Sequence, residues 1–190
     1  PEAALRLLTL MQGRLPGMVS AFELMARIGF QFLAEVMPDL RQPFESLPDW
    51  AVLVELGLPA GIEPEATMAS LYAEGAEDGL VLDGVIATSD AQADALWALR
   101  ESIPLANRRV GAIASHDISL PPGAIPEFLA RAQEALAGVP INCFGHLGDG
   151  NLHYNLFPLP GRDKADYTDR RAALSETVHD LVMALDGSIS

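Results

Sequence analysis

The hydrophobic pattern alternates between helical and strand-like spacing along the chain. Apolar residues at helical spacing predict helices over residues 2–12, 27–37, 64–75, 89–104, 126–138 and about 166–186. Short apolar runs bounded by Gly and Pro predict strands over residues 50–56, 82–87, 118–120, 141–146 and 152–157. Residues 19–24 remain open, because Ser20 and Glu23 have the spacing of a helix capping box while the segment also fits a strand.

The order of these elements predicts the fold class. Two βαβ-like passes are followed by a β-α-β-β-α pass, which is typical of a layered α+β domain. We therefore expect ferredoxin-like layers over residues 1–190, with a largely antiparallel sheet covered by helices.

The charge and the cysteine content limit the classes of binding partner that we expect. The 190 residues carry 12 Lys and Arg against 26 Asp and Glu, giving a net charge of −14. Such a surface repels nucleic acid and anionic membranes, so we expect neither as a partner. No apolar run is long enough for a transmembrane helix, and Cys143 alone forms no internal disulfide framework. We expect a cytoplasmic protein, or one held peripherally at the inner membrane.

The two ends of the sequence indicate a piece of a longer protein. The chain starts at Pro1 without an initiator Met or a signal-peptide pattern. It stops at Ser190, shortly after Gly187, the expected helix C-cap. We therefore expect residues 1–190 to be a domain truncated at both ends.

A hairpin motif carries the candidate chemistry. Asp149 and Gly150 between two apolar strands predict a two-residue type I′ turn. That register places His146 directly opposite His153, with their side chains on one face of the sheet. Asn155 shares this face by strand alternation, whereas Cys143 lies on the other.

Two opposed imidazoles can bind one divalent metal ion, although a stable site needs a third ligand. The spacing alone leaves two other interpretations open. The histidines can simply pack or form hydrogen bonds, or the backbone N–H groups of Gly145, Gly148 and Gly150 can bind a phosphate. A nucleotide P-loop is not supported, since no Lys-Ser/Thr pair follows the glycines.

Four collinear segments resemble the C-terminal domain of the FAD-linked oxidases. This family includes D-lactate dehydrogenase, the glycolate oxidase flavin subunit and D-2-hydroxyglutarate dehydrogenase. Residues 145–153 resemble its Gly-His-x-Gly-Asp-Gly-Asn-x-His signature, and residues 96–101 its Leu-Trp-x-x-Arg-Glu helix. Residues 116–121 resemble its Asp-x-Ser-x-Pro strand, and residues 186–190 the lead-in to its Glu-His-Gly-Ile-Gly segment. The resemblance covers nearly the whole chain.

The resemblance implies a role for each candidate residue. An upstream domain would bind FAD, and this domain would cover the flavin and shape the substrate pocket. His146 and His153 would bind a divalent metal ion such as Zn or Mn. Arg100 would hold the substrate carboxylate and Asn155 would face the substrate. The reaction implied is oxidation of a D-2-hydroxy acid to the 2-oxo acid by hydride transfer to flavin.

Two departures from the family pattern bear on the substrate. Pro104 and Ser115 stand where 2-hydroxyglutarate-type members have a threonine and a lysine that contact a carboxylate. Their absence favours lactate, glycolate or a longer 2-hydroxy acid over a dicarboxylate. The family's Glu-His pair would follow Ser190, where the Glu is a third metal ligand and the His a candidate base. No catalytic base is identified within the chain, and we expect residues 1–190 alone to be inactive.

Other readings of the sequence compete with this one. The chain could be a ferredoxin-like small-molecule-binding or regulatory module without redox activity, or a metallohydrolase with an unidentified third ligand. We expect Asp117 to form structural hydrogen bonds, His116 to be exposed and His179 to be partly buried. Without a flavin domain this domain would expose an apolar face, which would allow it to form a homo-oligomer.

Overall fold

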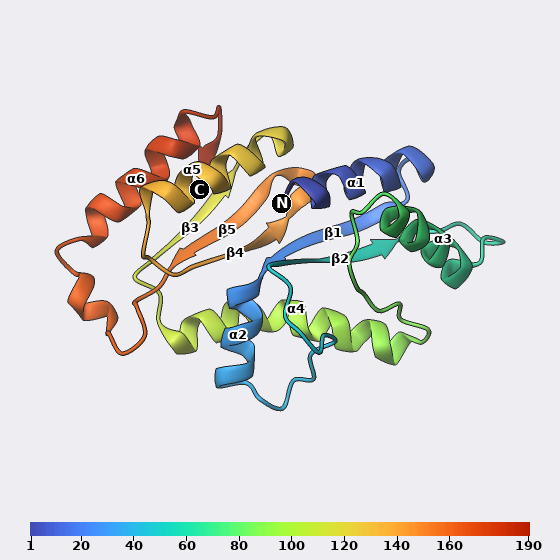
Figure 1. Ribbon diagram of the computed structural model, residues 1–190, viewed down its shortest axis with the longest axis horizontal. Coiled ribbons are helices and arrows are strands. Elements are labelled where there is room, and N and C mark those ends of the chain that lie inside the picture. Colours follow the sequence, from blue (N-terminus) through green and yellow to red (C-terminus); the bar gives the residue numbers. More distant parts are fainter.

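The computed structural model describes residues 1–190 as a mixed sheet-and-helix domain (Figure 1). Six strands form one sheet in the order β2-β1-β4-β5-β3-β6, and all neighbouring strands are antiparallel. The strands are β1 Val19–Ala26, β2 Trp50–Leu56, β3 Ala114–Ser119, β4 Ile141–His146, β5 Asn151–Leu156 and β6 Ser188–Ile189. The predicted α+β class with an antiparallel sheet is therefore confirmed.

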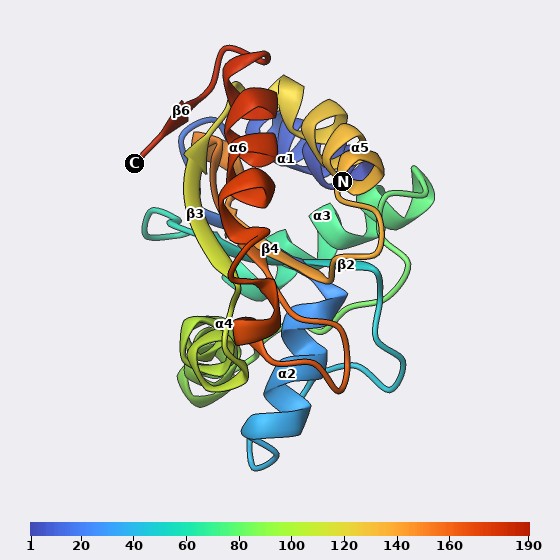
Figure 2. The ribbon, with the colours of Figure 1, turned by 90° about the vertical axis from the view of Figure 1, so that its left-hand side faces the viewer.

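Helices cover the two faces of the sheet unequally. The helices are α1 Glu2–Arg14, α2 Arg27–Val36, α3 Pro64–Glu77, α4 Asp90–Val110, α5 Ile125–Ala135 and α6 Arg171–Met183. Figure 2 shows α1, α3, α5 and α6 on one side of the sheet, with α2 and α4 on the other. None of these helices combines the length and the apolar composition needed to span a bilayer.

Strand alternation gives the sheet two chemically different faces. On the core face, side chains such as Leu24, Leu152 and Tyr154 join a cluster of 24 buried apolar residues under α1, α3, α5 and α6. On the opposite face, which we call the site face, a cluster of only 8 buried residues lies beneath α2 and α4. Part of the site face therefore remains available for polar residues.

The predicted start of α4 is confirmed, and side chains cap it. Ser89 is the N-cap of α4, and its hydroxyl accepts a hydrogen bond from the backbone N–H of Gln92. The Gln92 side-chain oxygen in turn accepts one from the N–H of Thr88. The helix continues past Pro104 to Val110, further than the sequence predicts.

Three predictions about elements need correction or completion. Residues 82–87 form no strand, and Leu82 is 95 % exposed in the connection before α4. Residues 19–24, which the sequence left open, begin β1 and pair with β2, so they form a strand and not a helix start. The short strand β6 was not predicted and pairs with β3 after the end of α6.

Candidate functional site

The polar residues of the site face lie in rows that run across neighbouring strands. A first row places Glu23 of β1 beside His146 of β4, and His146 beside Asn151 of β5. A second row runs through Met25, Phe144, His153 and Asp117 on β1, β4, β5 and β3. A third row contains Asn142, Asn155 and Ser115 on β4, β5 and β3. The sequence signature therefore folds into the centre of the sheet.

His146 stands at the end of β4 with its side chain 54 % exposed. Its Nδ1 contacts Oε1 of Glu23, a residue with no exposed surface. That Glu23 oxygen has no other partner and no hydrogen bond of good geometry. The Nε2 atom of His146 has no hydrogen-bond partner in the chain, so it is available to a ligand.

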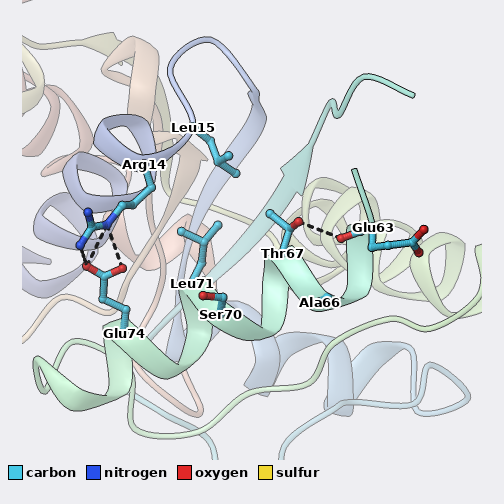
Figure 3. A pocket seen from close by; sticks show the side chains of 8 residues that line it. All are labelled: Arg14, Leu15, Glu63, Ala66, Thr67, Ser70, Leu71 and Glu74. Carbon is cyan, nitrogen blue, oxygen red and sulfur yellow. Dashed lines mark hydrogen bonds and ion pairs between the residues drawn. The ribbon is translucent and has the colours of Figure 1, made fainter. Parts of the chain in front are cut away.

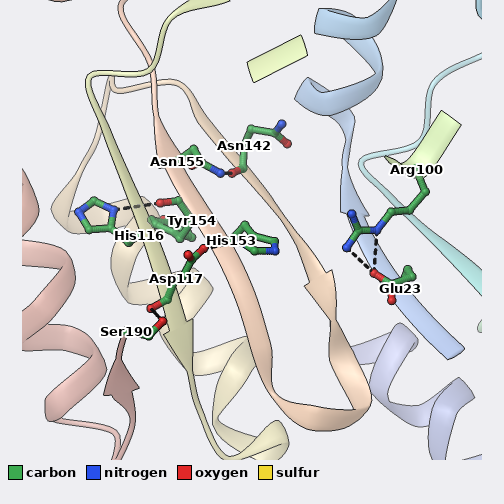
Figure 4. A network of polar contacts seen from close by, with 9 residues as sticks. All are labelled: Glu23, Arg100, His116, Asp117, Asn142, His153, Tyr154, Asn155 and Ser190. Atoms are coloured by element: carbon green, nitrogen blue, oxygen red, sulfur yellow. Dashed lines mark hydrogen bonds and ion pairs between the residues drawn. The ribbon is translucent and has the colours of Figure 1, made fainter. Parts of the chain in front are cut away.

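His153 has a matching arrangement on β5. Its Nδ1 is hydrogen-bonded to Oδ1 of Asp117, the residue opposite it on β3 (Figure 4). The Phe144 ring packs against the imidazole at 4.8 Å between ring centroids. The prediction that Asp117 forms hydrogen bonds is confirmed, and its partner is a candidate metal ligand.

Arg100 reaches the site face from α4. Its Nε donates a hydrogen bond to Glu23 Oε2 at 2.8 Å, and its Nη2 lies 2.7 Å from the same oxygen. The guanidinium also stands over the Phe144 ring, 5.1 Å from the ring centroid. The Nη1 atom has no hydrogen-bond partner in the chain. Arg100 is thus a buried counter-ion of Glu23 that keeps donors for a second anion.

Asn155 lies two residues beyond His153 and on the same face, as predicted. It is 6 % exposed, and its Nδ2 donates a long hydrogen bond of 3.4 Å to the backbone carbonyl of Asn142. Ser115 is the exposed residue opposite Asn155 on β3. Pro104 follows Arg100 by one helical turn, so it lies on the same side of α4. Both departures from the family pattern are therefore near the site.

The predicted register of the hairpin is wrong, although both histidines lie on the same face of the sheet, as predicted. A 3₁₀ turn at Leu147–Asp149 and a left-handed Gly150 connect the strands, so His146 pairs with Asn151 and not with His153. The two histidines are therefore diagonal neighbours. Diagonal residues on one face have Cα atoms roughly 7–8 Å apart, which long side chains can bridge.

Two glycines of the motif, one in the turn and one in β4, lie where a side chain would clash with neighbouring backbone. Gly150 has φ of 74°, and a Cβ there would lie 1.9 Å from the carbonyl oxygen of Leu120. Its N–H donates within the turn to the carbonyl of Leu147. A Cβ on Gly145 would meet the carbonyl oxygen of Asn151 at 2.4 Å. Close backbone packing thus explains both glycines, and this disfavours the phosphate-binding interpretation.

The prediction that His116 is exposed is wrong. His116 is 5 % exposed on the core face, and its Nδ1 is hydrogen-bonded to the carbonyl of Tyr154. Its ring stands edge-on to His179 with centroids 5.3 Å apart. Burial is the main reason that the pKa of His116 lies below its ordinary value. His179 is partly buried, as predicted.

Two other places in the structure lack the chemistry of the site face. Cys143 is buried on the core face, where desolvation raises the pKa of its thiol to about 12 and disfavours a nucleophilic role. A hollow between α1 and α3 is lined by Thr67, Ser70 and Glu74 among others, and contains no histidine or cysteine (Figure 3). The Arg14–Glu74 ion pair closes one side of it.

No group of three or more His, Cys, Asp or Glu side chains in residues 1–190 is arranged to hold a metal ion. The donors present on the site face are the two Nε2 atoms of His146 and His153. This set fits two of the ligands of a divalent ion that takes at least one more ligand from elsewhere. Ser190 lies against the backbone of Asp117, whose side chain is hydrogen-bonded to His153.

Glu23 is the site residue that the sequence pattern did not reveal. Its spacing from Ser20 suggested a helix cap, whereas its partners Arg100 and His146 are distant in the sequence. A charged residue flanked on both sides by apolar strand residues was the available signal. A charged side chain in a buried strand is stable only when a polar partner pairs with it, so such a residue indicates a buried ion pair or hydrogen bond.

Fold and site together define an α+β domain with a pair of imidazoles on the less covered face of its sheet. Its sequence matches the family of FAD linked oxidases, C-terminal domain, over residues 2–190, and the chain belongs to that family. This match confirms the resemblance drawn from residues 145–153 and their three companion segments.

Several curated relatives are D-2-hydroxyglutarate dehydrogenases. The protein from Xanthomonas citri pv. viticola is 35 % identical over 152 residues, covering 78 % of this chain and 32 % of the relative. The mitochondrial protein from Danio rerio is 32 % identical over 181 residues, covering 94 % and 33 %. The mitochondrial protein from Arabidopsis thaliana is 30 % identical over 174 residues, covering 90 % and 30 %. The chain thus spans about a third of the length of these relatives.

Proposed function

We propose that this chain is the substrate- and metal-binding domain of an FAD-dependent oxidoreductase that oxidises a D-2-hydroxy acid to the 2-oxo acid. The observation that carries the proposal is the pair His146 and His153. They belong to the family signature and present unpartnered Nε2 atoms on the less covered side of the sheet. Family membership favours this function over a regulatory module, and a self-contained metallohydrolase lacks a third ligand in the chain.

FAD, bound mainly by a separate domain, would accept the hydride from C2 of the substrate. His146 and His153 would hold a divalent ion such as Zn or Mn, which would lower the pKa of the substrate 2-hydroxyl. Arg100 would bind the substrate carboxylate through Nη1 while Glu23 keeps the guanidinium in place. Asn155 would orient the substrate from the neighbouring row. The aromatic ring of Phe144 would limit water between the arginine and His153.

The choice of 2-hydroxy acid rests on two opposing arguments. The relatives named above are D-2-hydroxyglutarate dehydrogenases. In this chain, however, Pro104 and Ser115 replace two expected carboxylate contacts, and Pro104 has no side-chain hydrogen-bond donor. We therefore propose a monocarboxylate such as lactate or glycolate, or a longer 2-hydroxy acid, as the preferred substrate.

The test is an anaerobic absorption spectrum of the complete protein that carries this chain, before and after adding D-lactate, glycolate, D-2-hydroxyglutarate and longer D-2-hydroxy acids. Bleaching of the visible flavin band by one acid supports the reaction and identifies the substrate. Preferential bleaching by D-2-hydroxyglutarate would overturn the substrate preference alone. A protein without flavin, or with flavin that no acid bleaches, would contradict the proposed reaction.

Three alanine variants test the metal assignment. His146→Ala and His153→Ala should abolish flavin reduction by the best acid while the proteins stay folded. His179→Ala is the matched control, because it removes a partly buried imidazole from α6, on the other side of the sheet. Unimpaired turnover in both site variants would show that these histidines hold no catalytic metal ion.

A further inference from the structure

Both histidines of the proposed metal site have a carboxylate on the same ring atom. Nδ1 of His146 contacts Oε1 of Glu23, and Nδ1 of His153 is hydrogen-bonded to Oδ1 of Asp117. An ionised carboxylate can only accept hydrogen bonds, so each Nδ1 must carry the hydrogen. The lone pair of each neutral ring is then on Nε2, the atom that has no hydrogen-bond partner in the chain.

The two carboxylates differ in how firmly they are held. Asp117 has a side chain that is 62 % exposed, and its one side-chain partner is His153. Glu23 has no exposed surface and is fixed by two contacts from Arg100 to its other oxygen. Glu23 therefore has one oxygen for the arginine and one for the histidine, and neither oxygen can turn toward water.

The burial of Glu23 has a cost that its two partners offset. A carboxylate without solvent is strongly destabilising unless it is paired and hydrogen-bonded. The Arg100 guanidinium supplies the positive charge, and the remaining oxygen has no hydrogen-bond donor near it except His146. The His146 ring is thus the one group in contact with this oxygen that can offer it a donor, and it can do so only when Nδ1 carries the hydrogen.

We propose that Glu23 is a positioning residue that sets two groups of the site at once. It holds His146 as the Nδ1–H tautomer with Nε2 directed at the metal ion, and it holds Arg100 with Nη1 directed at the substrate carboxylate. The proposal rests on the proposed metal and substrate roles of those two residues. Removing a carboxylate that orients a metal-ligating histidine typically lowers metal affinity 10–100-fold.

The first measurement is made on the complete wild-type protein without metal. Two-dimensional ¹⁵N–¹H NMR of the histidine rings reports which ring nitrogen carries the hydrogen. The expected result is an Nδ1–H tautomer for His146. An Nε2–H tautomer would overturn the proposal, and this outcome depends on no substitution.

The second measurement is calorimetric titration with Zn²⁺ and Mn²⁺ of the wild type, Glu23→Gln and Glu74→Gln. We expect Glu23→Gln to bind roughly 10–100-fold more weakly, because an amide no longer dictates the Nδ1–H tautomer. Glu74→Gln is the matched control, since it breaks another Arg–Glu pair, with Arg14, between α1 and α3. It should bind metal like the wild type.

A parallel readout separates positioning from simple structural damage. In Glu23→Gln, the KM for the 2-hydroxy acid should rise through the loosened Arg100, and His146 should become a mixture of tautomers. Glu23→Asp keeps the charge and should recover part of the metal affinity. Wild-type metal affinity in folded Glu23→Gln would overturn the role of Glu23 alone. A wild-type protein that binds no metal would instead overturn the proposed metal site and, with it, the metal role of Glu23.

Discussion

The two faces of the sheet are built from the same strands but differ in what covers them. The core face is closed by four helices over a continuous apolar cluster, whereas α2 and α4 cover only part of the site face. Adjacent residues such as Phe144 and Cys143, or His153 and Tyr154, therefore meet opposite environments. Strand alternation lets one short signature supply core residues and candidate ligands in turn.

This contrast predicts that stability and binding can be changed separately. Phe128 of α5 is fully buried against the core face, with its ring 5.0 Å from that of Tyr154. Phe128→Ala should lower the free energy of unfolding by about 3–5 kcal/mol, the usual cost of an aromatic core truncation. Urea denaturation followed by circular dichroism measures this change.

A milder variant at the same position tests whether the faces are independent. Phe128→Leu should stay folded, and its Zn²⁺ affinity should match that of the wild type because its contacts lie on the core face. A clear drop in the metal affinity of Phe128→Leu would show that the two faces are energetically coupled.

The turn that connects β4 and β5 at the motif gives a second prediction. Gly150→Ala should cost roughly 2–4 kcal/mol, since it combines a positive φ with a Cβ that would overlap the Leu120 backbone. Gly13→Ala is the control, because Gly13 lies inside α1 with no atom within 4 Å of the new Cβ. In the helix the same substitution should stabilise the protein by up to about 1 kcal/mol. Equal melting shifts in both variants would contradict the explanation of the turn.

The smallest expected effect concerns acid stability of the core face. Burial lowers the pKa of His116, and the charges of His179 and Arg171 add to the effect. The hydrogen bond with the Tyr154 backbone and the charge of Asp117 oppose it. The unfolded chain therefore takes up a proton first, below about pH 6.5, so stability falls as the pH drops through the window beneath that value. Thermal melts from about pH 7 to about pH 5 should show a shallower pH dependence for His116→Asn than for the wild type. An unchanged slope would contradict a buried neutral His116.

Much of the fold follows from local signals in the sequence. The strand at residues 50–56 and the helix after Ser89 are fixed by short apolar runs and a side-chain cap. The strand predicted over residues 82–87 is wrong, because a short apolar run has the pattern of a strand even when no neighbouring strand pairs with it. The hydrophobic pattern indicates that a segment is compatible with a strand, but it does not show whether another strand lies beside it to pair with.

The site could be predicted only where local alternation decides it. The hairpin register was wrong by two positions along β5, a shift that keeps every side chain on its face, so His146 and His153 still share the site face. Glu23 and Arg100 are 77 residues apart, and their pairing depends on the order of strands in the sheet. No spacing in the sequence encodes that contact.

The pairing of β1 with β4 also has a consequence for how the chain folds. The β4–β5 hairpin closes a short loop, whereas β1 must wait for a strand more than half the chain away. Closing such a long loop costs entropy before its contacts are gained, so local hairpins form ahead of distant pairings. On a ribosome, Glu23 would leave the exit tunnel long before His146 is synthesised. The carboxylate would stay hydrated until the late docking of the two halves, which makes assembly of the site one of the last events of folding.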